Sequence, residues 1–475
     1  MPSTFFGLEI ARRGLMAQRL AMDTAAHNLA NANTEGYTRQ EAVQAATPPY
    51  TIPTKEQTVV PGQLGTGVEV AAIRRIRDEL LDVQLRRALG EAGFWEERED
   101  ALSRVEAIFP EPSEYGLQQL IGKFFNNWHE LNNNPHDLGL KAAVRVAGEE
   151  LTAAVRQTYR QLTDNEKNLR DLILEKVNEV NTIAEEINNL NREIRTLVRA
   201  GAQPNDLFDR RDVLLDRLAR IGEVQVERQS DGVVKVSLFG KELVPPDPTA
   251  GAHTVTAYDA ATGAGKFDHP DDELWLEFSS DPGNRVNITS AANTYSLSGA
   301  LVGIEGARQK VKDYMQQLND LADSLIAQVN QAHPYEENPP GTVIRADFFK
   351  GTGAENFDLS DLVKNDLNYI DGTRALTVAG LRDDLTMAGG TTTFEGFYRQ
   401  LVTRIGEDMR GSAERTAGAR AVRKQLENLR QAVSGVSVDE ELTRLMQYQY
   451  AFQASARVVG VLDQLLDTLI NRMAS

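Results

Sequence analysis

The fold is decided by residues 137–201, which read DLGLKAAVRVAGEELTAAVRQTYRQLTDNEKNLRDLILEKVNEVNTIAEEINNLNREIRTLVRAG. Apolar residues recur in this stretch at steps of three and four, which is the spacing of one helix face. Asp137 can cap such a helix at its start, and Gly201 can end it. An unbroken helix of this length would be on the order of 90 Å long. It must pack against other helices, because an isolated helix gains little stability in water.

The same periodicity predicts helices on both sides of this rod. They are expected at 4–34, throughout 78–221, and at 301–329, 393–433 and 438–473. Between the first two, residues 38–75 are expected to be extended, because four prolines prevent a helix there, with strand character at 68–73. Residues 333–392 are predicted to be rich in loops.

One segment differs from the helical pattern. Residues 224–239 alternate like two strands around Asp231-Gly232, which indicates a hairpin with a two-residue loop. Another strand is expected at 274–278. Residues 222–298 also have twelve acidic and five basic side chains, which favours a solvated position. This segment is therefore predicted to be a small β insertion.

We expect a mainly α protein with a β insertion, of the α+β class, in which the segments are nested. Nesting brings the two chain ends together, so the first and last helices are natural antiparallel coiled-coil partners. The expected units are a terminal helical coiled-coil assembly domain with an extended linker (1–77 with 434–475), a long-helix bundle domain (78–221 with 299–433) and a small β-rich outer domain (222–298).

The composition limits the possible functions. The chain has 475 residues, a formal net charge of −18 and no cysteine. The lack of cysteine excludes disulfides, zinc ribbons, iron–sulfur clusters and thiol nucleophiles. The negative charge argues against nucleic acid and anionic lipid as partners, and no stretch reaches the ~20 apolar residues of a membrane span. Charged residues interrupt the first apolar stretch, so we expect no cleavable signal peptide.

Motifs that would indicate chemistry occur only as near-misses. Residues 260–267 approach a phosphate-binding loop, but Ala260 replaces its first glycine. His129 begins a zinc-protease helix pattern, but Asn133 stands where the second histidine is required. The acidic run 268–273 lacks the spacing and the central glycine of a calcium loop. We therefore expect no catalytic residue, no cofactor and no metal.

The terminal helices have narrow apolar stripes. A stripe this thin, far in sequence from any other core, buries little area unless another copy or a partner covers it. This favours an assembly surface. The stripe of the first helix is Leu8, Ala11, Leu15, Gln18, Met22, Ala25 and Leu29, and that of the last is Leu442, Leu445, Gln449, Phe452, Ala456, Val459, Leu462, Leu466, Leu469 and Met473.

Two segments resemble a known family. Residues 27–39, HNLANANTEGYTR, are similar to the N-terminal signature of bacterial flagellar rod, hook and hook-associated proteins. Residues 434–458, which begin SGVSVDEEL and end QYAFQASARV, are similar to the matching C-terminal signature. Three further segments resemble the hook-associated members at the hook–filament junction: 65–76, 205–216 and 347–349.

The resemblance implies a structural, non-enzymatic protein that is exported through the flagellar type III apparatus and lies outside the cell in the flagellum. It implies a ring between hook and filament. The implied partners are other copies of the chain, the hook protein, the second junction protein, and an export chaperone with its apparatus. Neither nucleic acid nor membrane insertion is expected. Family members typically have terminal regions that are disordered in the free monomer and order on assembly.

On this hypothesis the two terminal helices pack as an antiparallel pair, and neighbouring subunits cover the rest of their stripes. The expected contacts lie between Leu8, Leu15, Met22 and Leu29 on one helix and Leu445, Phe452, Val459, Leu466 and Leu469 on the other. The turn that redirects the chain outward would be formed by Asn31, Asn33, Gly36 and Tyr37.

Three alternatives stay open. The chain could be another flagellar axial protein, namely the hook protein or the second junction protein, although the long helix at 137–200 argues against the β-rich hook. It could be a cytosolic coiled-coil scaffold without any link to flagella. A hydrolase or metal-dependent enzyme that uses 222–298 is supported only by the near-misses.

Overall fold

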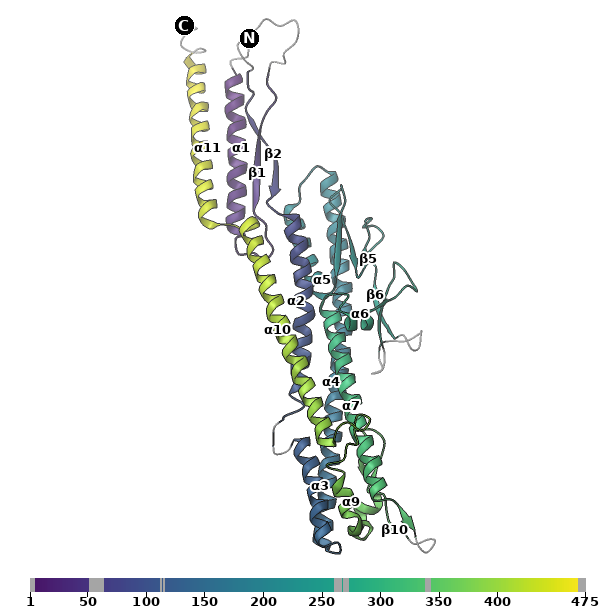
Figure 1. Ribbon diagram of the computed structural model, residues 1–475. Helices are drawn as coiled ribbons and strands as arrows, with labels where there is room; N and C mark the ends of the chain where they lie inside the picture. Colours follow the sequence, from purple (N-terminus) through teal and green to yellow (C-terminus); the bar gives the residue numbers. More distant parts are fainter. Residues whose placement is uncertain are drawn as a thin grey trace.

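The computed structural model describes residues 5–50, 64–111, 113, 116–259, 267, 273–337 and 343–468. The molecule is elongated and mostly helical, with its first and last helices side by side at one end (Figure 1). Its sheets are small and antiparallel. The prediction of a mainly α protein with a minor β part is confirmed.

The long helices run roughly parallel to the long dimension of the molecule in Figure 1, whereas α6 (Ile288–Thr294) and the two three-stranded sheets lie to one side. The helices are α1 (Phe6–Ala30), α2 (Glu79–Glu106), α3 (Leu117–Asn133), α4 (Leu138–Arg199), α5 (Asn205–Ile221), α6 (Ile288–Thr294), α7 (Ala300–Ala332), α8 (Asp361–Asn365), α9 (Ala375–Gly380), α10 (Phe394–Ser434) and α11 (Val438–Asp467). The strands are β1 (Gln40–Ala46), β2 (Val68–Arg75), β3 (Val224–Arg228), β4 (Val234–Leu238), β5 (Lys241–Val244), β6 (Val255–Asp259), β7 (Leu274–Phe278), β8 (Val286–Asn287), β9 (Glu336–Glu337), β10 (Val343–Arg345), β11 (Phe349–Lys350) and β12 (Asp358–Leu359).

The central rod α4 has the bounds that the sequence predicts. The Asp137 side chain accepts hydrogen bonds from the backbone N–H groups of Gly139 and Leu140, at 2.7 and 3.1 Å. Gly201, just beyond the last turn, has φ +83°, a conformation that glycine adopts without strain. Along its length α4 packs against α3, α5 and α7, so the rod is the common support of the body.

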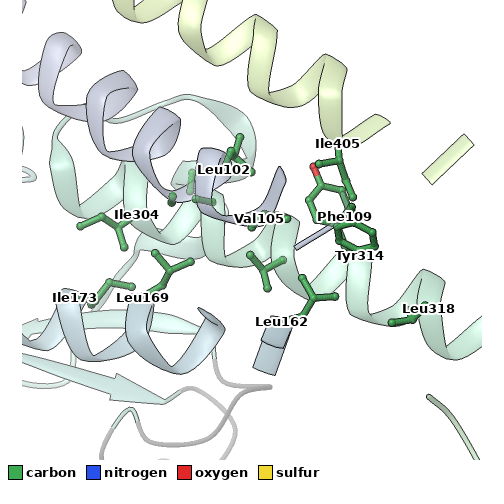
Figure 2. Close-up of a cluster of buried hydrophobic side chains, with 14 of the residues drawn as sticks. Leu102, Val105, Phe109, Leu162, Leu169, Ile173, Ile304, Tyr314, Leu318 and Ile405 are labelled. Carbon is green, nitrogen blue, oxygen red and sulfur yellow. The ribbon is translucent and has the colours of Figure 1, made fainter. Parts of the chain in front are cut away.

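The core of the body lies where α2, α4, α7 and α10 meet. Figure 2 shows side chains from these helices, and Phe109 just after α2, converging in one cluster. A buried ion pair also links two of the helices, because Arg308 of α7 donates to Glu166 of α4 at 2.9 Å. Tyr314 of α7 in turn donates to Asp408 of α10 at 2.7 Å. Packing and these polar contacts therefore join the long helices.

The β segment packs against α4 as two three-stranded sheets, ordered β3-β4-β5 and β6-β7-β8. Asn191 of α4 exchanges hydrogen bonds with the backbone of Val234, and Asn181 does the same with Val255. The buried residues of both sheets belong to the same hydrophobic cluster as the helices. The β insertion thus shares the core of the helical body.

The predicted hairpin exists, but the prediction of a two-residue loop is wrong. Gln229 and Val233 still pair through a backbone hydrogen bond of 2.8 Å, so three residues form the loop. Gly232 donates to Gln229 and has φ +82°. This is the three-residue loop in which a turn is followed by a left-handed glycine. Gly232 was correctly predicted to lie in the loop, but its position within the loop depends on the register of β3 and β4.

The stretch between α7 and α10 is made of short elements, as its loop-rich sequence predicts. It nevertheless contributes to the core, because Phe348, Phe349 and Phe357 are almost fully buried. His333 is also buried; its Nδ1 donates to Ala346 O at 2.9 Å, and its Nε2 accepts from the backbone N–H of Asp371 at 2.8 Å. Buried aromatic side chains thus hold this loop-rich stretch against the long helices.

Candidate assembly interface

The terminal helices α1 and α11 lie side by side and antiparallel, with β1 and β2 next to α1 (Figure 1). Small residues allow their close approach. A Cβ atom at Gly7 would lie 3.4 Å from Leu462 Cδ1, and one at Gly14 would lie 3.3 Å from Ser455 Oγ. The fully buried apolar side chains of α1 are all alanines, at positions 11, 17, 21 and 25. The α1–α11 contact is therefore narrow and buries little large apolar surface.

The larger predicted side chains flank this contact. Leu8, Leu15, Met22 and Leu29 on α1 are half-buried, as are Leu445, Phe452, Val459 and Leu466 on α11. Leu469 lies outside the described residues. The glycine and alanine positions could have indicated this contact from the sequence, because small residues at helical spacing permit two helices to approach closely. The contacts predicted from the sequence involve the large apolar residues instead.

A second stripe of α11 faces away from α1. Its large apolar residues recur at steps of three, four or eight, which places them on one helix face. Their side chains are between 43% and 71% exposed. They are Leu442, Met446, Tyr450, Val458, Val461 and Leu465. An apolar stripe of this length on one helix is typical of a surface that a further helix or subunit covers.

The predicted turn follows α1 directly. Asn31 is the C-cap residue of α1, and its backbone O accepts from the N–H of Thr34 at 2.9 Å. Gly36 has φ +76°, and a Cβ there would overlap the side chain of Val213 on α5. Asn33 is exposed, and Tyr37 is half-buried. Gly36 is thus needed both for the backbone conformation and for the close approach to α5.

Asn28 joins the terminal helices to the turn and to β1. Its Oδ1 accepts from the Tyr37 hydroxyl at 2.8 Å and from Gln40 N at 2.9 Å. Its Nδ2 donates to Gln40 O at 2.8 Å and to Glu441 Oε2 of α11 at 3.0 Å. Burial and the charge of Asp206 raise the pKa of Tyr37, which keeps its hydroxyl as a neutral donor. Asn28 is not among the residues that were predicted to form the turn or the helix contact.

Polar contacts on α5 connect this terminal part to the body. Asp209 Oδ2 accepts from Thr38 N at 2.9 Å, and its Oδ1 accepts from Arg75 at 2.8 Å. Asp212 contacts Arg75, Arg77 and Arg86 at 2.8, 3.1 and 3.3 Å. These side chains come from β2, α2 and the segment between them. The 205–216 segment therefore supplies the attachment point of the terminal part.

The charge of Asp212 is stabilised strongly. Burial alone would raise the pKa of this carboxyl group, but the charges of Arg77, Arg75 and Arg86 outweigh burial and lower the pKa to about 2. Asp216, one turn further along α5, accepts from Arg430 of α10 at 2.5 Å. Arg39 also contributes to the attachment. Its backbone N–H donates to Ser434 O at 2.9 Å, and its guanidinium pairs with Glu440 at 3.0 Å.

The chain matches three family profiles, which together cover both ends and the body. "Flagellar hook-associated protein FlgK helical domain" matches residues 102–349, which is more than half of the chain. The chain belongs to the FlgK family of flagellar hook-associated proteins. "Flagella basal body rod protein" matches residues 8–38, and "Flagellar basal body rod FlgEFG protein C-terminal" matches residues 430–473. The FlgK-family chain is thus a structural protein of the flagellar axis.

Similar proteins span the whole FlgK-family chain. "Flagellar hook-associated protein 1" of Bacillus subtilis is 29% identical, with 100% of this chain and 99% of that protein covered. The protein of the same name in Salmonella typhimurium is 26% identical, with 97% and 98% covered. The solved flagellar hook junction protein FlgK from Burkholderia pseudomallei has a TM-score of 0.60 at 14% identity, and it covers 74% of this chain and 100% of its own. The fold is therefore shared with a solved FlgK.

The near-miss motifs gain no support. His129 lies exposed on α3. The sequence 260–266 and the run 268–272 are outside the described residues, whereas Phe267 is buried beneath the guanidinium of Arg308. Among the described residues, we find no cluster of His, Asp and Glu that could hold a metal ion. Within the same ranges, none of the helices combines the length and hydropathy of a membrane span.

Proposed function

We propose that this FlgK-family protein forms the junction ring between hook and filament and that it polymerises through α1 and α11. It would reach the outside of the cell through the flagellar type III apparatus, escorted by an export chaperone, and would act without enzymatic activity. Its partners would be other copies of itself, the hook protein on one side and the second junction protein on the other. The exposed apolar stripe of α11 is the observation that carries this proposal.

Covering that stripe would lower the free energy of the assembled ring. Full burial of a large apolar side chain contributes ~1.5–3 kcal/mol. Six such side chains about half exposed could contribute about 5 kcal/mol per copy when a neighbour covers them. The α1–α11 contact is itself narrow, so neighbouring copies would supply stability that the pair lacks alone. This favours a coiled-coil terminal domain (1–77 with 434–475) that completes its packing in the ring.

The other nested units follow from the same proposal. The long-helix bundle (78–221 with 299–433) would form the body of each subunit, attached to the terminal domain through Asp209 and Asp212. Residues 222–298 would form the outer domain, where their acidic side chains stay solvated. The turn at Asn31, Asn33, Gly36 and Tyr37 would direct the chain outward from the ring.

A deletion strain tests the proposal. It should make hooks without filaments and should release flagellin into the medium. Electron microscopy that shows normal filaments would contradict the proposal, and the loss of the hook would reassign the chain to the hook protein. Mass spectrometry of sheared wild-type flagella should detect the chain; its absence would favour a scaffold unrelated to flagella.

Complementation tests the stripe itself. Met446→Asp with Val461→Asp should restore export of the protein into the medium but not filament growth, because two charges then lie on the proposed contact surface. The matched control is Met446→Leu with Val461→Ile, which keeps the stripe apolar and should restore filaments. Equal filament growth with both variants would contradict assembly through this face.

A further inference from the structure

A basic pocket lies between the end of β2, the α4–α5 connection and the β3–β4 loop. Its volume is about 570 Å³, and residues from all three segments line it. In a chain with a net charge of −18, five of its lining residues are arginines and one is acidic. They are Arg74, Arg75, Arg77, Arg211, Arg228 and Glu79.

Four of these arginines have carboxylate partners. Arg75 pairs with Asp209 and Asp212, each at 2.8 Å. Arg77 pairs with Asp82 at 2.6 Å, Arg228 with Glu79 at 2.5 Å, and Arg74 with Glu41 at 3.0 Å. The charges of Arg74, Arg75 and Arg77 are thus largely balanced by groups of the chain itself. Arg228 pairs through its Nη1, and its side chain is 37% exposed beside the pocket.

Arg211 differs from the other four. It is only 3% exposed, and its Nη1 donates to two neutral oxygens, Asn191 Oδ1 at 3.1 Å and Gly232 O at 2.7 Å. Within the described part of the chain, its Nε has no hydrogen-bond partner, and it forms no ion pair. Its guanidinium lies 5.2 Å from the centre of the Phe208 ring, which Arg75 approaches to 4.9 Å.

The positive charge of Arg211 is not balanced by the groups around it. Burial lowers the pKa of Arg211, and the charges of Arg75, Arg228 and Arg86 lower it as well, whereas Asp212 raises it. The resulting pKa is about 10. The 17-residue helix α5 also begins at the pocket, with Gln203 and Asn205 in its wall. The backbone N–H of Asn205 donates to Gln203 O at 2.9 Å, so the helix end contributes its partial charge and not a free donor. A helix N-terminus carries a partial positive charge that favours anions.

We propose that this pocket binds an oxyanion, with Arg211 and Arg228 as its ligands and the partial positive charge of the α5 N-terminus beside them. The buried Nε–H of Arg211, which has no partner among the described residues, and the guanidinium of Arg228 are donors from which phosphate and carboxylate groups accept hydrogen bonds. The oxyanion is either free inorganic phosphate or the carboxylate of an acidic side chain on a second copy. The site does not depend on the proposed ring, because its geometry lies within one copy.

Calorimetric titration of the full chain with potassium phosphate, against potassium chloride at equal ionic strength, tests the site. We expect phosphate to bind and to raise the melting temperature more than chloride does. Arg228→Gln should weaken binding about tenfold, the usual effect of losing one charge-assisted hydrogen bond. The matched control is Arg104→Gln, which removes an exposed arginine of α2 that also has one carboxylate partner, Asp100 at 2.5 Å.

Sedimentation velocity distinguishes the two sources of the oxyanion. If the wild type self-associates in chloride, and if phosphate and Arg228→Gln both reduce this association, the carboxylate of a second copy is the ligand. If the chain binds phosphate and stays monomeric, the ligand is a free oxyanion. The proposal is overturned if phosphate acts no differently from chloride and Arg228→Gln does not change association. It is also overturned if Arg104→Gln weakens phosphate binding as much as Arg228→Gln does.

Discussion

Replacing Asn28 by alanine should release the terminal helices from the turn and from β1. Asn28 is 1% exposed and makes four side-chain hydrogen bonds. The substitution leaves the N–H and the carbonyl of Gln40 and the carboxylate of Glu441 without this partner, and these two residues are only 7% and 2% exposed. Each buried polar group that loses its partner costs ~1–3 kcal/mol. Tyr37 is half-buried, so water can replace Asn28 as the partner of its hydroxyl group. We therefore expect the local stability to fall by about 3–4 kcal/mol in total.

Hydrogen exchange followed by mass spectrometry measures this local loss. Peptides that cover 38–46 and 438–450 contain the partners of Asn28 on β1 and α11. Since every 1.4 kcal/mol is a factor of ten, their exchange should accelerate by about two to three orders of magnitude. Peptides from α4 and α7 should not change, because the core of the body does not depend on Asn28.

Asn33→Ala is the matched control, because it removes the same side chain from an exposed position of the same turn. It should alter exchange by less than about 0.5 kcal/mol. The reasoning is refuted if Asn28→Ala leaves the 38–46 peptide unchanged, or if Asn33→Ala has an equal effect. A wild-type 38–46 peptide that exchanges as fast as a free peptide would also refute it, because the Asn28 contacts would then contribute no protection.

Three further predictions concern the attachment to α5 and the buried histidine. Asp212→Asn should lower the free energy of unfolding of the body by about 3–5 kcal/mol, because it leaves three arginines without the carboxylate that they share. Urea titration measures this change. The control Asp439→Asn, at an exposed position, should change the free energy of unfolding by less than about 0.5 kcal/mol. Gly36→Ala should lower the melting temperature through its φ of +76° and its overlap with Val213; adding Val213→Ala should restore only the part due to overlap, and full restoration would argue against backbone strain. Burial lowers the pKa of His333 to about 4 from 6.5, so the unfolded chain binds more protons between these values. Stability should therefore be constant for this group above pH 6.5 and fall by about 3 kcal/mol towards pH 4, and urea titration of His333→Gln should show a smaller fall.

The long helices could be predicted because their determinants are local. Asp137 and Gly201 set the ends of α4 through contacts within one turn, and the apolar periodicity indicates which face is buried. The hairpin at 224–238 was also visible in the sequence, but its loop length was not. Loop length depends on which residues of β3 and β4 face each other, and that register is fixed by packing against Asn191 of α4.

The candidate interface was less predictable for a related reason. The apolar stripe of α11 could be read from spacing, but the spacing did not indicate which residues would face α1. That choice follows from Gly7 and Gly14, whose lack of side chains lets α11 approach closely. The spacing of apolar residues in the sequence draws attention to large side chains, whereas the close contact of two helices requires small ones.

The sequence by itself determined the helical elements, the β segment and the two terminal signatures, because each depends on residues within a few turns of one another. Only the tertiary structure decided how the ends attach to the body. Asn28 meets Glu441 across 413 positions of the chain, and Thr38 meets Asp209 across 171. Such polar contacts leave no periodic pattern in the sequence, because their partners become neighbours only after the chain has folded. The attachment on α5 is therefore a property of the folded chain.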